Sequence, residues 1–331
     1  MRPLKPGTAE YSLSGYGDMI ADTVRMNAYR EALARSIVPG DVVLDLGAGT
    51  GIMSLLACRL GAAKVYAIEP SDAIAVGMEL ARANGCADRI EFIQKSSLDT
   101  RLRRRARVMV SDLRGVLPLH GLHVPSIVDA RRRLLVPGGI QIPRRDTLFV
   151  QLIGDAALHA KDRKPWHDGA FGLDLSPALK WQSHCWGKAD LTRSTPSGAA
   201  RPVFELDYRA LESPNARGGA QWSVEADATV HGLGAWFDAD LGDGVGFSNA
   251  PAAPRAIYGQ AFFPFPAPLA LHAGQQVDVV LTATLVNGNY VWQWGTTLRD
   301  AGGRVVGDWR QSSFQGTPVN PARLAQRRKR R

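Results

Sequence analysis

The chain has 331 residues, of which 45% are hydrophobic and 21% charged, and its formal net charge at pH 7 is +9. The length suggests about two domains, and the apolar content is enough for two cores. No apolar run approaches the ~18 residues of a membrane-spanning helix, and residues 1–17 lack the apolar segment of a secretory signal. We therefore expect a cytoplasmic globular protein without a membrane anchor.

Residues 1–37 are expected to form a helical cover, with the helical pattern in residues 10–37. Apolar residues fall roughly on one helical stripe: Met19, Ile20, Val24, Ala28 and Leu33. Arg25 is one of the polar members. Its planar guanidinium could hold a carboxylate through two parallel hydrogen bonds, or it could form a surface ion pair with Asp22 or Glu31.

Residues 42–69 predict a strand, a glycine loop, a helix and a second strand. The loop contains Gly47, Gly49 and Gly51, whose missing Cβ atoms allow a ligand to approach the backbone. Glu69 ends the second strand, where a βαβ unit places an acid against ribose hydroxyls. The segment therefore predicts a nucleoside site. An ordinary glycine-rich turn is the alternative.

Ile52 decides which nucleoside is expected. The dinucleotide fingerprint needs glycine at this position, so an oxidoreductase that uses a nicotinamide cofactor is disfavoured. The pattern D-x-G-x-G-x-G resembles motif I of class I methyltransferases, which bind S-adenosylmethionine. The resemblance implies cofactor contacts from one set of residues: Asp45, Gly47, Ala48, Gly49, Thr50, Gly51, Glu69 and Pro70.

The remainder of the first half alternates predicted helices and strands. We expect a helix that starts at Ser71 and stops at Asn84, strands at residues 90–94 and 108–110, and a helix at residues 124–135. A turn at 136–139 and one long strand at 140–153 should follow. Residues 38–150 are thus predicted to form a Rossmann-like α/β domain.

The second half has a different pattern. Residues 221–230 alternate apolar and polar side chains, and residues 204–208, 277–286 and 290–298 are further predicted strands separated by turn residues. Residues 151–322 should therefore form an antiparallel domain. The basic tail, residues 323–331, is expected to be disordered.

The segment YGDMIADTVRMNAYREAL in the N-terminal cover resembles the part of protein arginine N-methyltransferases that folds over the cofactor. The resemblance implies that Arg25 pairs with the methionine carboxylate of S-adenosylmethionine and that Met19 lies beside the methyl-transfer site. Tyr16 stands where the family usually has histidine. Ser97 and Leu98 match the family's adenine contacts, although an acid is usual at the position of Leu98.

The same resemblance covers about residues 10–322 and implies a class I methyltransferase domain followed by an antiparallel β-barrel-like domain. Residues 164–179 are similar to the family's dimerisation arm, which we place at about residues 160–190. A homodimer is the expectation. An ordinary loop in a monomer is the alternative.

Two segments depart from the family pattern. In the loop of residues 111–121, Asp112 aligns with the first of two glutamates that clamp the acceptor guanidinium, but Gly121 aligns with the second. Ala256, Ile257 and Tyr258 replace a threonine, histidine and tryptophan segment.

Histidines flank the position of the missing acid. His120 and His123 could each serve as a general base, or be ordinary exposed loop residues. The other histidines and the three cysteines lack metal-ligand spacing. We expect no metal.

These features predict an S-adenosylmethionine-dependent methyltransferase that releases S-adenosylhomocysteine. Asp112 should orient the acceptor, with Met19 and His120 as further catalytic candidates and Asp112 also near the cofactor. Two acceptors are considered: a nitrogen or oxygen of a peptide or small molecule other than arginine, which needs no second acid, and peptidyl arginine. A non-catalytic cofactor-binding scaffold is a further alternative. Another is an RNA methyltransferase that uses the arginine clusters at residues 101–107, 131–133 and 327–331, although we do not expect nucleic-acid binding.

Overall fold

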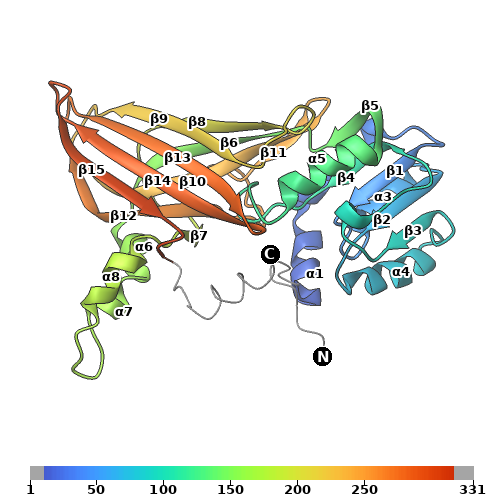
Figure 1. Ribbon diagram of the computed structural model, residues 1–331, viewed down its shortest axis with the longest axis horizontal. Helices are drawn as coiled ribbons and strands as arrows, with labels where there is room; N and C mark the ends of the chain where they lie inside the picture. Colours follow the sequence, from blue (N-terminus) through green and yellow to red (C-terminus); the bar gives the residue numbers. More distant parts are fainter. Residues whose placement is uncertain (1–10, 317–331) are drawn as a thin grey trace, which may run out of the picture.

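The computed structural model describes residues 11–316, so the predicted tail lies outside the described residues. Figure 1 shows a parallel sheet flanked by helices at one end of the molecule and long antiparallel strands at the other. A helical arm projects from the antiparallel part. No helix within residues 11–316 is long and apolar enough to cross a membrane.

Two helices precede the parallel sheet. Helix α1 (Leu13–Ala21) and helix α2 (Thr23–Ser36) meet at Asp22, which caps α2 by accepting a hydrogen bond from the Arg25 backbone N–H at 3.1 Å. Helix α2 buries Ala28 and Leu33, but α1 has no buried residue. The prediction of one apolar stripe along both helices is therefore wrong for α1, because the chain changes direction at Asp22.

The parallel sheet has the strand order β3-β2-β1-β4-β5, and all neighbouring strands are parallel. The order places the fully buried β1 at the centre, which explains its continuous apolar sequence. The strands are β1 (Val42–Leu46), β2 (Lys64–Ile68), β3 (Ile90–Ile93), β4 (Ala106–Ser111) and β5 (Leu135–Ile142). The connections contain α3 (Ile52–Arg59), α4 (Ala73–Ala83), the 3₁₀ turn η1 (Ser97–Asp99) and α5 (His123–Arg133).

Helix α4 stops at Ala83, where a stop was predicted, and Gly85 has a φ of 65°. Its N-cap residue is Asp72, not Ser71. The helix begins one residue later than predicted. Ser71 directly precedes the N-cap residue, and its Oγ accepts a hydrogen bond from the Ala73 N–H at 3.4 Å.

The predicted turn and long strand after α5 are wrong. Strand β5 runs through residues 136–139, and the register with β4 shifts between Ala106 and Val108 to accommodate them. As an edge strand, β5 tolerates Pro137, which cannot donate a ladder hydrogen bond. A cis peptide bond joins Ile142 to Pro143. The chain then enters a different sheet as β6 (Arg145–Gly154).

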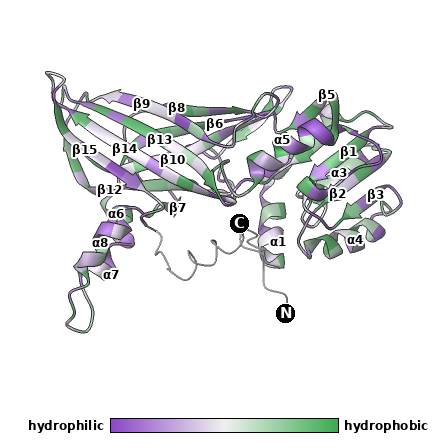
Figure 2. Cartoon of the chain, in the orientation of Figure 1, coloured by the Kyte–Doolittle hydropathy of each residue, from purple (hydrophilic) through white to green (hydrophobic). Residues whose placement is uncertain are grey.

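The second half forms two antiparallel sheets. One has the order β7-β12-β10-β6-β8, with β11 paired to β10, and the other has the order β15-β14-β13-β9. Hydrophobic and paler segments alternate along several strands in Figure 2, as expected where one face packs inward. The strands are β7 (Gly187–Ala189), β8 (Thr195–Asp207), β9 (Ala216–Ser223), β10 (Ala228–Gly242), β11 (Val245–Ser248), β12 (Gln260–Leu271), β13 (Gln276–Val286), β14 (Asn289–Arg299) and β15 (Val305–Ser312).

The prediction of a single strand at residues 221–230 is wrong. Strand β9 ends at Ser223 and β10 begins at Ala228. Trp222 and Val230 are buried as the alternation indicated, but Ala226 is exposed because it lies in the turn between the two strands.

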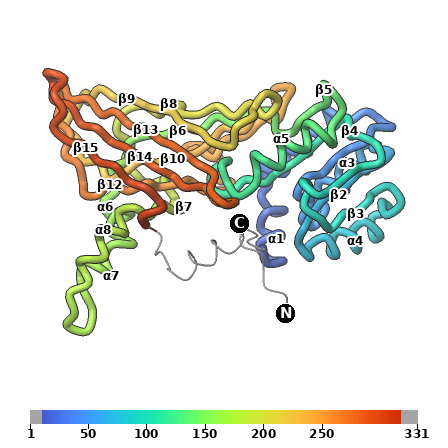
Figure 3. Tube along the Cα trace, viewed as in Figure 1, coloured from blue at the N-terminus to red at the C-terminus, as the bar shows by residue number. Residues whose placement is uncertain are grey.

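The helical arm lies between β6 and β7. It contains α6 (Ala156–Lys161), α7 (Lys164–His167), the 3₁₀ turn η2 (Ser176–Ala178) and α8 (Leu179–Gln182). The trace in Figure 3 shows that the tip of the arm lies well away from the rest of the chain. Apolar side chains along it are exposed: Trp166, Phe171, Leu173 and Trp181.

The two halves meet along α2 and α5. Helix α2 packs against β10 and β11. Arg131 on α5 donates from Nη1 to the carbonyl oxygens of Tyr208 at 2.6 Å and Leu211 at 2.9 Å. These contacts place the carboxyl ends of β1 and β4 beside the antiparallel strands, so residues from both halves can form one site.

Candidate active site

The glycine loop after β1 has no room for side chains at two of its glycines. Gly47 and Gly49 have φ values of 77° and 55°, a region that favours glycine. A Cβ on Gly47 would lie 2.1 Å from Leu113 Cδ2, and one on Gly49 would lie 2.6 Å from Cε1 of Tyr16. The aromatic ring of Tyr16 therefore lies directly against this loop, with Ala48 and Thr50 buried beside it.

Glu69 is held in a fixed orientation at the end of β2. Its Oε2 accepts from the Gly49 N–H at 2.9 Å, and its Oε1 accepts from the Ser71 N–H at 2.8 Å. An ionised carboxylate can accept about four hydrogen bonds, so two positions are left for the hydroxyls of a ribose. Pro70, the next residue, is exposed.

Asp45, another residue of the predicted cofactor set, makes its side-chain contact inside the protein. It is 2% exposed, and its Oδ2 accepts from Ser54 Oγ at 2.7 Å. Burial raises the pKa of Asp45 to about 7. Its observed contact ties β1 to α3.

The predicted adenine segment is positioned by an arginine on α5. Ser97 is buried, whereas Leu98 is 41% exposed. Arg133 Nη2 donates to the Ser97 carbonyl oxygen at 2.9 Å, and its Nε donates to Asp129 Oδ1 at 2.7 Å, the predicted i,i+4 pair. The backbone of this segment is thus fixed, as an adenine contact through backbone groups would need.

Arg25 lies inside the protein and does not form a surface ion pair. Its Nη1 donates to Asp112 Oδ2 at 2.6 Å, and its Nη2 donates to the Met19 carbonyl oxygen at 2.7 Å. Burial alone would lower the pKa of Arg25, but Asp112 more than offsets this and raises it. Its Nε is buried and has no hydrogen-bond partner within residues 11–316. This donor suits the carboxylate of an amino-acid cofactor, since a buried unpaired donor is costly.

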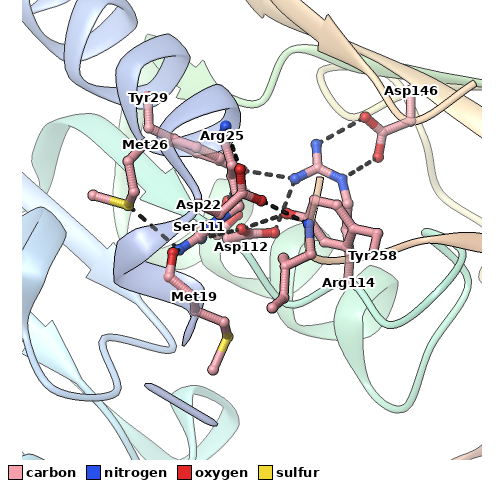
Figure 4. Close-up of polar contacts among 11 residues, drawn as sticks. Met19, Asp22, Arg25, Met26, Tyr29, Ser111, Asp112, Arg114, Asp146 and Tyr258 are labelled. Atoms are coloured by element: carbon pink, nitrogen blue, oxygen red, sulfur yellow. Dashed lines mark hydrogen bonds and ion pairs between the residues drawn. The ribbon is translucent and has the colours of Figure 1, made fainter. Parts of the chain in front are cut away.

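Asp112 receives hydrogen bonds from three parts of the chain (Figure 4). Arg25 and the Tyr258 hydroxyl donate to Oδ2, both at 2.6 Å, and Arg114 Nη1 donates to Oδ1 at 3.0 Å. Burial pushes the pKa of Asp112 up, but the two arginines and Tyr258 outweigh it, so the pKa is lowered. Asp112 is therefore an ionised carboxylate with few free lone pairs.

Arg114 was missed by the sequence analysis. Its side chain has no exposed surface. Its Nε and Nη2 each donate to Asp146 at 2.8 Å, and its Nη1 also donates to the Tyr29 hydroxyl at 2.6 Å. The hydroxyl of Tyr208 donates to Asp146 at 2.6 Å. Only the position of Arg114, two residues after Asp112, could have indicated its role. The pairing with Asp146 has no signal in the sequence.

Asp22 connects the N-terminal helices to the antiparallel half. In addition to capping α2, its Oδ2 accepts from the Ile257 N–H at 2.8 Å. Because Tyr258 follows Ile257, this contact fixes the backbone beside the tyrosine that binds Asp112. Residues 257 and 258 thus contact Asp22 and Asp112, two acids that precede the antiparallel half.

The two candidate histidines differ in their surroundings. His120 is exposed, with its ring against Gly115. His123 is 2% exposed, its Nδ1 lies 2.5 Å from the Pro118 carbonyl oxygen, and burial lowers its pKa to about 4. His123 is therefore a neutral core residue.

Gly121, which we expect at the position of the family's second glutamate, lies in open space. A Cβ on Gly121 would meet no atom within 4 Å, although the φ of 48° favours glycine. The described part of the chain contains no group of three or more His, Cys, Asp or Glu residues that could hold a metal ion.

Known proteins are similar to this chain both in the segment that contains the glycine loop and in the fold. The family model of the ribosomal protein L11 methyltransferase PrmA matches residues 27–113. An arginine N(omega)-methyltransferase from Streptomyces achromogenes subsp. streptozoticus is 31% identical over 269 residues, which cover 80% of this chain and 74% of that protein. The chain belongs to the arginine N-methyltransferase family.

Other arginine N-methyltransferases are similar to smaller or larger shares of the chain. Protein arginine N-methyltransferase 6 from Danio rerio is 37% identical over 179 residues, 53% of this chain, and the match spans only about half of that relative, 51%. The crystal structure of protein arginine methyltransferase 10 from Arabidopsis thaliana has a TM-score of 0.80 at 23% identity and covers 91% of this chain and 97% of that one. The predicted fold, a Rossmann-like domain followed by a barrel-like domain, is confirmed.

Proposed function

We propose that this arginine N-methyltransferase family member transfers the methyl group of S-adenosylmethionine to a guanidine nitrogen of arginine, free or in a peptide. The observation that carries the proposal is the buried Arg25–Asp112 pair, which lies between the glycine loop and the antiparallel half. The relatives' names support arginine as the acceptor.

The residues present fit the cofactor. Three features correspond to parts of the ligand. The glycine loop lets the nucleoside approach the backbone, and Glu69 has lone pairs for the ribose hydroxyls. The unpaired Nε of Arg25 can donate to the carboxylate. Structures of two family relatives are titled with the demethylated product, one from Trypanosoma brucei and one of protein arginine methyltransferase 6. When bound, S-adenosylmethionine supplies a methyl group activated on a sulfonium.

The chain's own contribution is positioning. Asp112 stays ionised and orients the acceptor nitrogen by accepting a hydrogen bond. Tyr16, which lies against the glycine loop, and Met19, whose carbonyl oxygen accepts from Arg25, exclude water. Holding donor and acceptor in line can account for most of the rate increase. His120 is exposed and can receive a proton from the product. These roles, the division into a cofactor domain and a substrate domain, and the homodimer are parts of the proposal.

A second acceptor class is favoured by one observation. Asp146, the other acid of this network, is engaged by Arg114 and Tyr208, and Gly121 has no side chain to replace the second glutamate. A cationic acceptor beside a sulfonium needs anions nearby. A less basic nitrogen or an oxygen of a peptide or small molecule, which needs one anion or none, is therefore the second candidate.

The test is transfer of labelled methyl from S-adenosylmethionine to free arginine, to an arginine-containing peptide and to a cell extract, followed by hydrolysis and amino-acid analysis. We expect labelled methylarginine. Label in another amino acid, without methylarginine, would favour the second candidate. Binding of S-adenosylhomocysteine without turnover on any acceptor would instead indicate a scaffold. Label that ribonuclease removes would indicate an RNA methyltransferase.

A further inference from the structure

The loop that carries Asp112 also inserts a guanidinium of its own into the site. Arg114 uses four N–H groups: two to Asp146, one to Tyr29 and one to Asp112. Its Cζ lies 5.4 Å from the ring centroid of Phe237 and 5.9 Å from that of Phe247. Acids at the edges and aromatic rings at the faces are the surroundings in which proteins bind guanidinium groups.

The charges of this network already balance without a ligand. Arg25 and Arg114 contribute two positive charges, and Asp112 and Asp146 contribute two negative charges. Neither acid of the network is therefore left unpaired to balance the positive charge of a guanidinium acceptor that binds beside the sulfonium. Three donors also occupy three of the about four positions that a carboxylate offers, so Asp112 retains one for the acceptor.

We propose that Arg114 is a specificity-determining residue: its guanidinium competes with a cationic acceptor for Asp112, so that the intact site distinguishes weakly between a guanidinium and a neutral group of the same shape. The inference rests on the proposed acceptor site at Asp112. It concerns which acceptors are preferred, and it holds whether arginine or a neutral group is the natural acceptor.

Arginine and citrulline form a suitable pair of probes, because citrulline replaces the guanidinium with a neutral urea of nearly the same shape. We would measure the dissociation constants of two glycine-flanked pentapeptides, one with arginine and one with citrulline, by calorimetry on the full chain saturated with S-adenosylhomocysteine. The ratio of the two constants is the readout, since general damage to the site affects both peptides.

For the natural chain we expect the two constants to agree within about threefold. In Arg114→Met, an unbranched apolar side chain can still pack on the two phenylalanines, while Asp112 gains a free lone pair and the site gains one negative charge. The preference for the arginine peptide should rise by at least about tenfold, the effect of a charge interaction worth one pKa unit. Arg114→Lys keeps the charge and should retain the natural ratio.

Two further variants complete the test. Arg114→Met with Asp146→Asn removes the uncompensated buried acid, in case the single variant does not fold, and should still raise the ratio because Asp112 remains freed. Arg144→Met is the matched control, because Arg144 pairs with Asp240 at 2.6 Å and does not contact Asp112.

An unchanged ratio in both Arg114→Met variants, a strong arginine preference in the natural chain, or failure of the Arg114→Met chains to bind the arginine peptide would overturn the inference. Failure of the natural chain to bind S-adenosylhomocysteine would instead overturn the proposed function, so the two failures are distinguishable.

Discussion

Asp112 compensates two buried guanidinium groups. It faces Arg25, Arg114 and the hydroxyl of Tyr258, and each of these is itself buried. Removing one partner of a buried ion pair costs more than the pair contributes, because the other charge is left uncompensated. The contribution of Asp112 should therefore be measured with a substitution that keeps its shape.

Asp112→Asn should reduce methyl transfer by roughly 100-fold, the scale of a misplaced reacting group. The amide keeps the size of the side chain but cannot compensate two guanidinium groups. Initial rates of labelled-methyl transfer give the effect, and calorimetry with S-adenosylhomocysteine checks that the cofactor site persists. Asp240→Asn, which alters the separate pair with Arg144, should keep full activity. Equal rates for Asp112→Asn and the natural chain would exclude Asp112 from the reaction.

Asp45 predicts a pH dependence of stability. Burial raises its pKa from 3.8 to about 7, so between these values the folded state binds more protons than the unfolded state. The free energy of unfolding that Asp45 contributes must then fall as pH rises through this window, by up to about 1.4 kcal/mol per pH unit. Urea unfolding at pH 5 and pH 8 should show that the advantage of the natural chain over Asp45→Asn decreases with pH.

Asp41 is the control for Asp45, because its pKa is shifted in the opposite direction. A hydrogen bond from Arg107 lowers the pKa of Asp41, so its contribution is complete above its unfolded pKa and is lost only as pH falls below about 4. The difference between the natural chain and Asp41→Asn should be constant from pH 5 to pH 8. A constant difference for Asp45→Asn as well would contradict the raised pKa.

At the scale of elements, the junction of α1 and α2 connects the N-terminal helices to the antiparallel half. Asp22 caps α2 and accepts from Ile257 in the antiparallel half, while α2 carries Arg25 and Tyr29 into the buried network. A change at this junction should therefore affect both stability and the site.

Asp22→Ala should lower the free energy of unfolding by about 1–2 kcal/mol, the cost of an N-cap together with an unpaired N–H. Asp22→Asn retains an acceptor oxygen and should lose less. Urea denaturation measures both variants. Ser12→Ala removes the cap of α1, which is exposed, and should cost less than Asp22→Ala. A larger loss for Ser12→Ala would mean that the contact with Ile257 contributes nothing.

A substitution in the glycine loop should change the affinity for the cofactor product. Gly49→Ala places a methyl group against the ring of Tyr16 and strains a backbone with a φ of 55°, so Tyr16 must move away from the glycine loop. The affinity for S-adenosylhomocysteine should fall by about tenfold or more, as an interaction loss near 1.4 kcal/mol implies. Gly17→Ala lies in α1, where an added Cβ meets no atom within 4 Å, and should leave the calorimetric affinity unchanged.

At the scale of the whole molecule, the arm carries the most exposed large apolar side chain within residues 11–316. Phe171 is 100% exposed and Leu173 62% exposed near its tip, and exposed apolar groups of this kind mark interaction sites. We expect a homodimer that Phe171→Glu converts to monomer, as measured by light scattering after gel filtration. Val306→Glu, on β15 and 49% exposed, is the control and should remain dimeric. A natural chain that is already monomeric would remove this expectation.

The sequence was sufficient for the elements with a strong local signal. The buried β1, the glycine loop and the stop of α4 follow from apolar runs and turn residues, so they could be predicted. The break at Ile142–Pro143 and the turn between Trp222 and Val230 could not, because a continuous pattern does not show in which sheet each strand pairs. Arg114 and Asp146 are joined only by tertiary packing, and no local pattern reveals such a pair.

The donors to Asp112 come from the start, the middle and the later part of the chain: residues 25, 114 and 258. A shortened gene product that stops after the parallel sheet would keep its glycine-lined turn but lose the tyrosine on which this carboxylate depends. Such a fragment would also lose the strands β10 and β11, against which α2 packs. Mutant libraries meant to change the acceptor should accordingly include codon 258, although it lies 146 positions from the acid it adjusts.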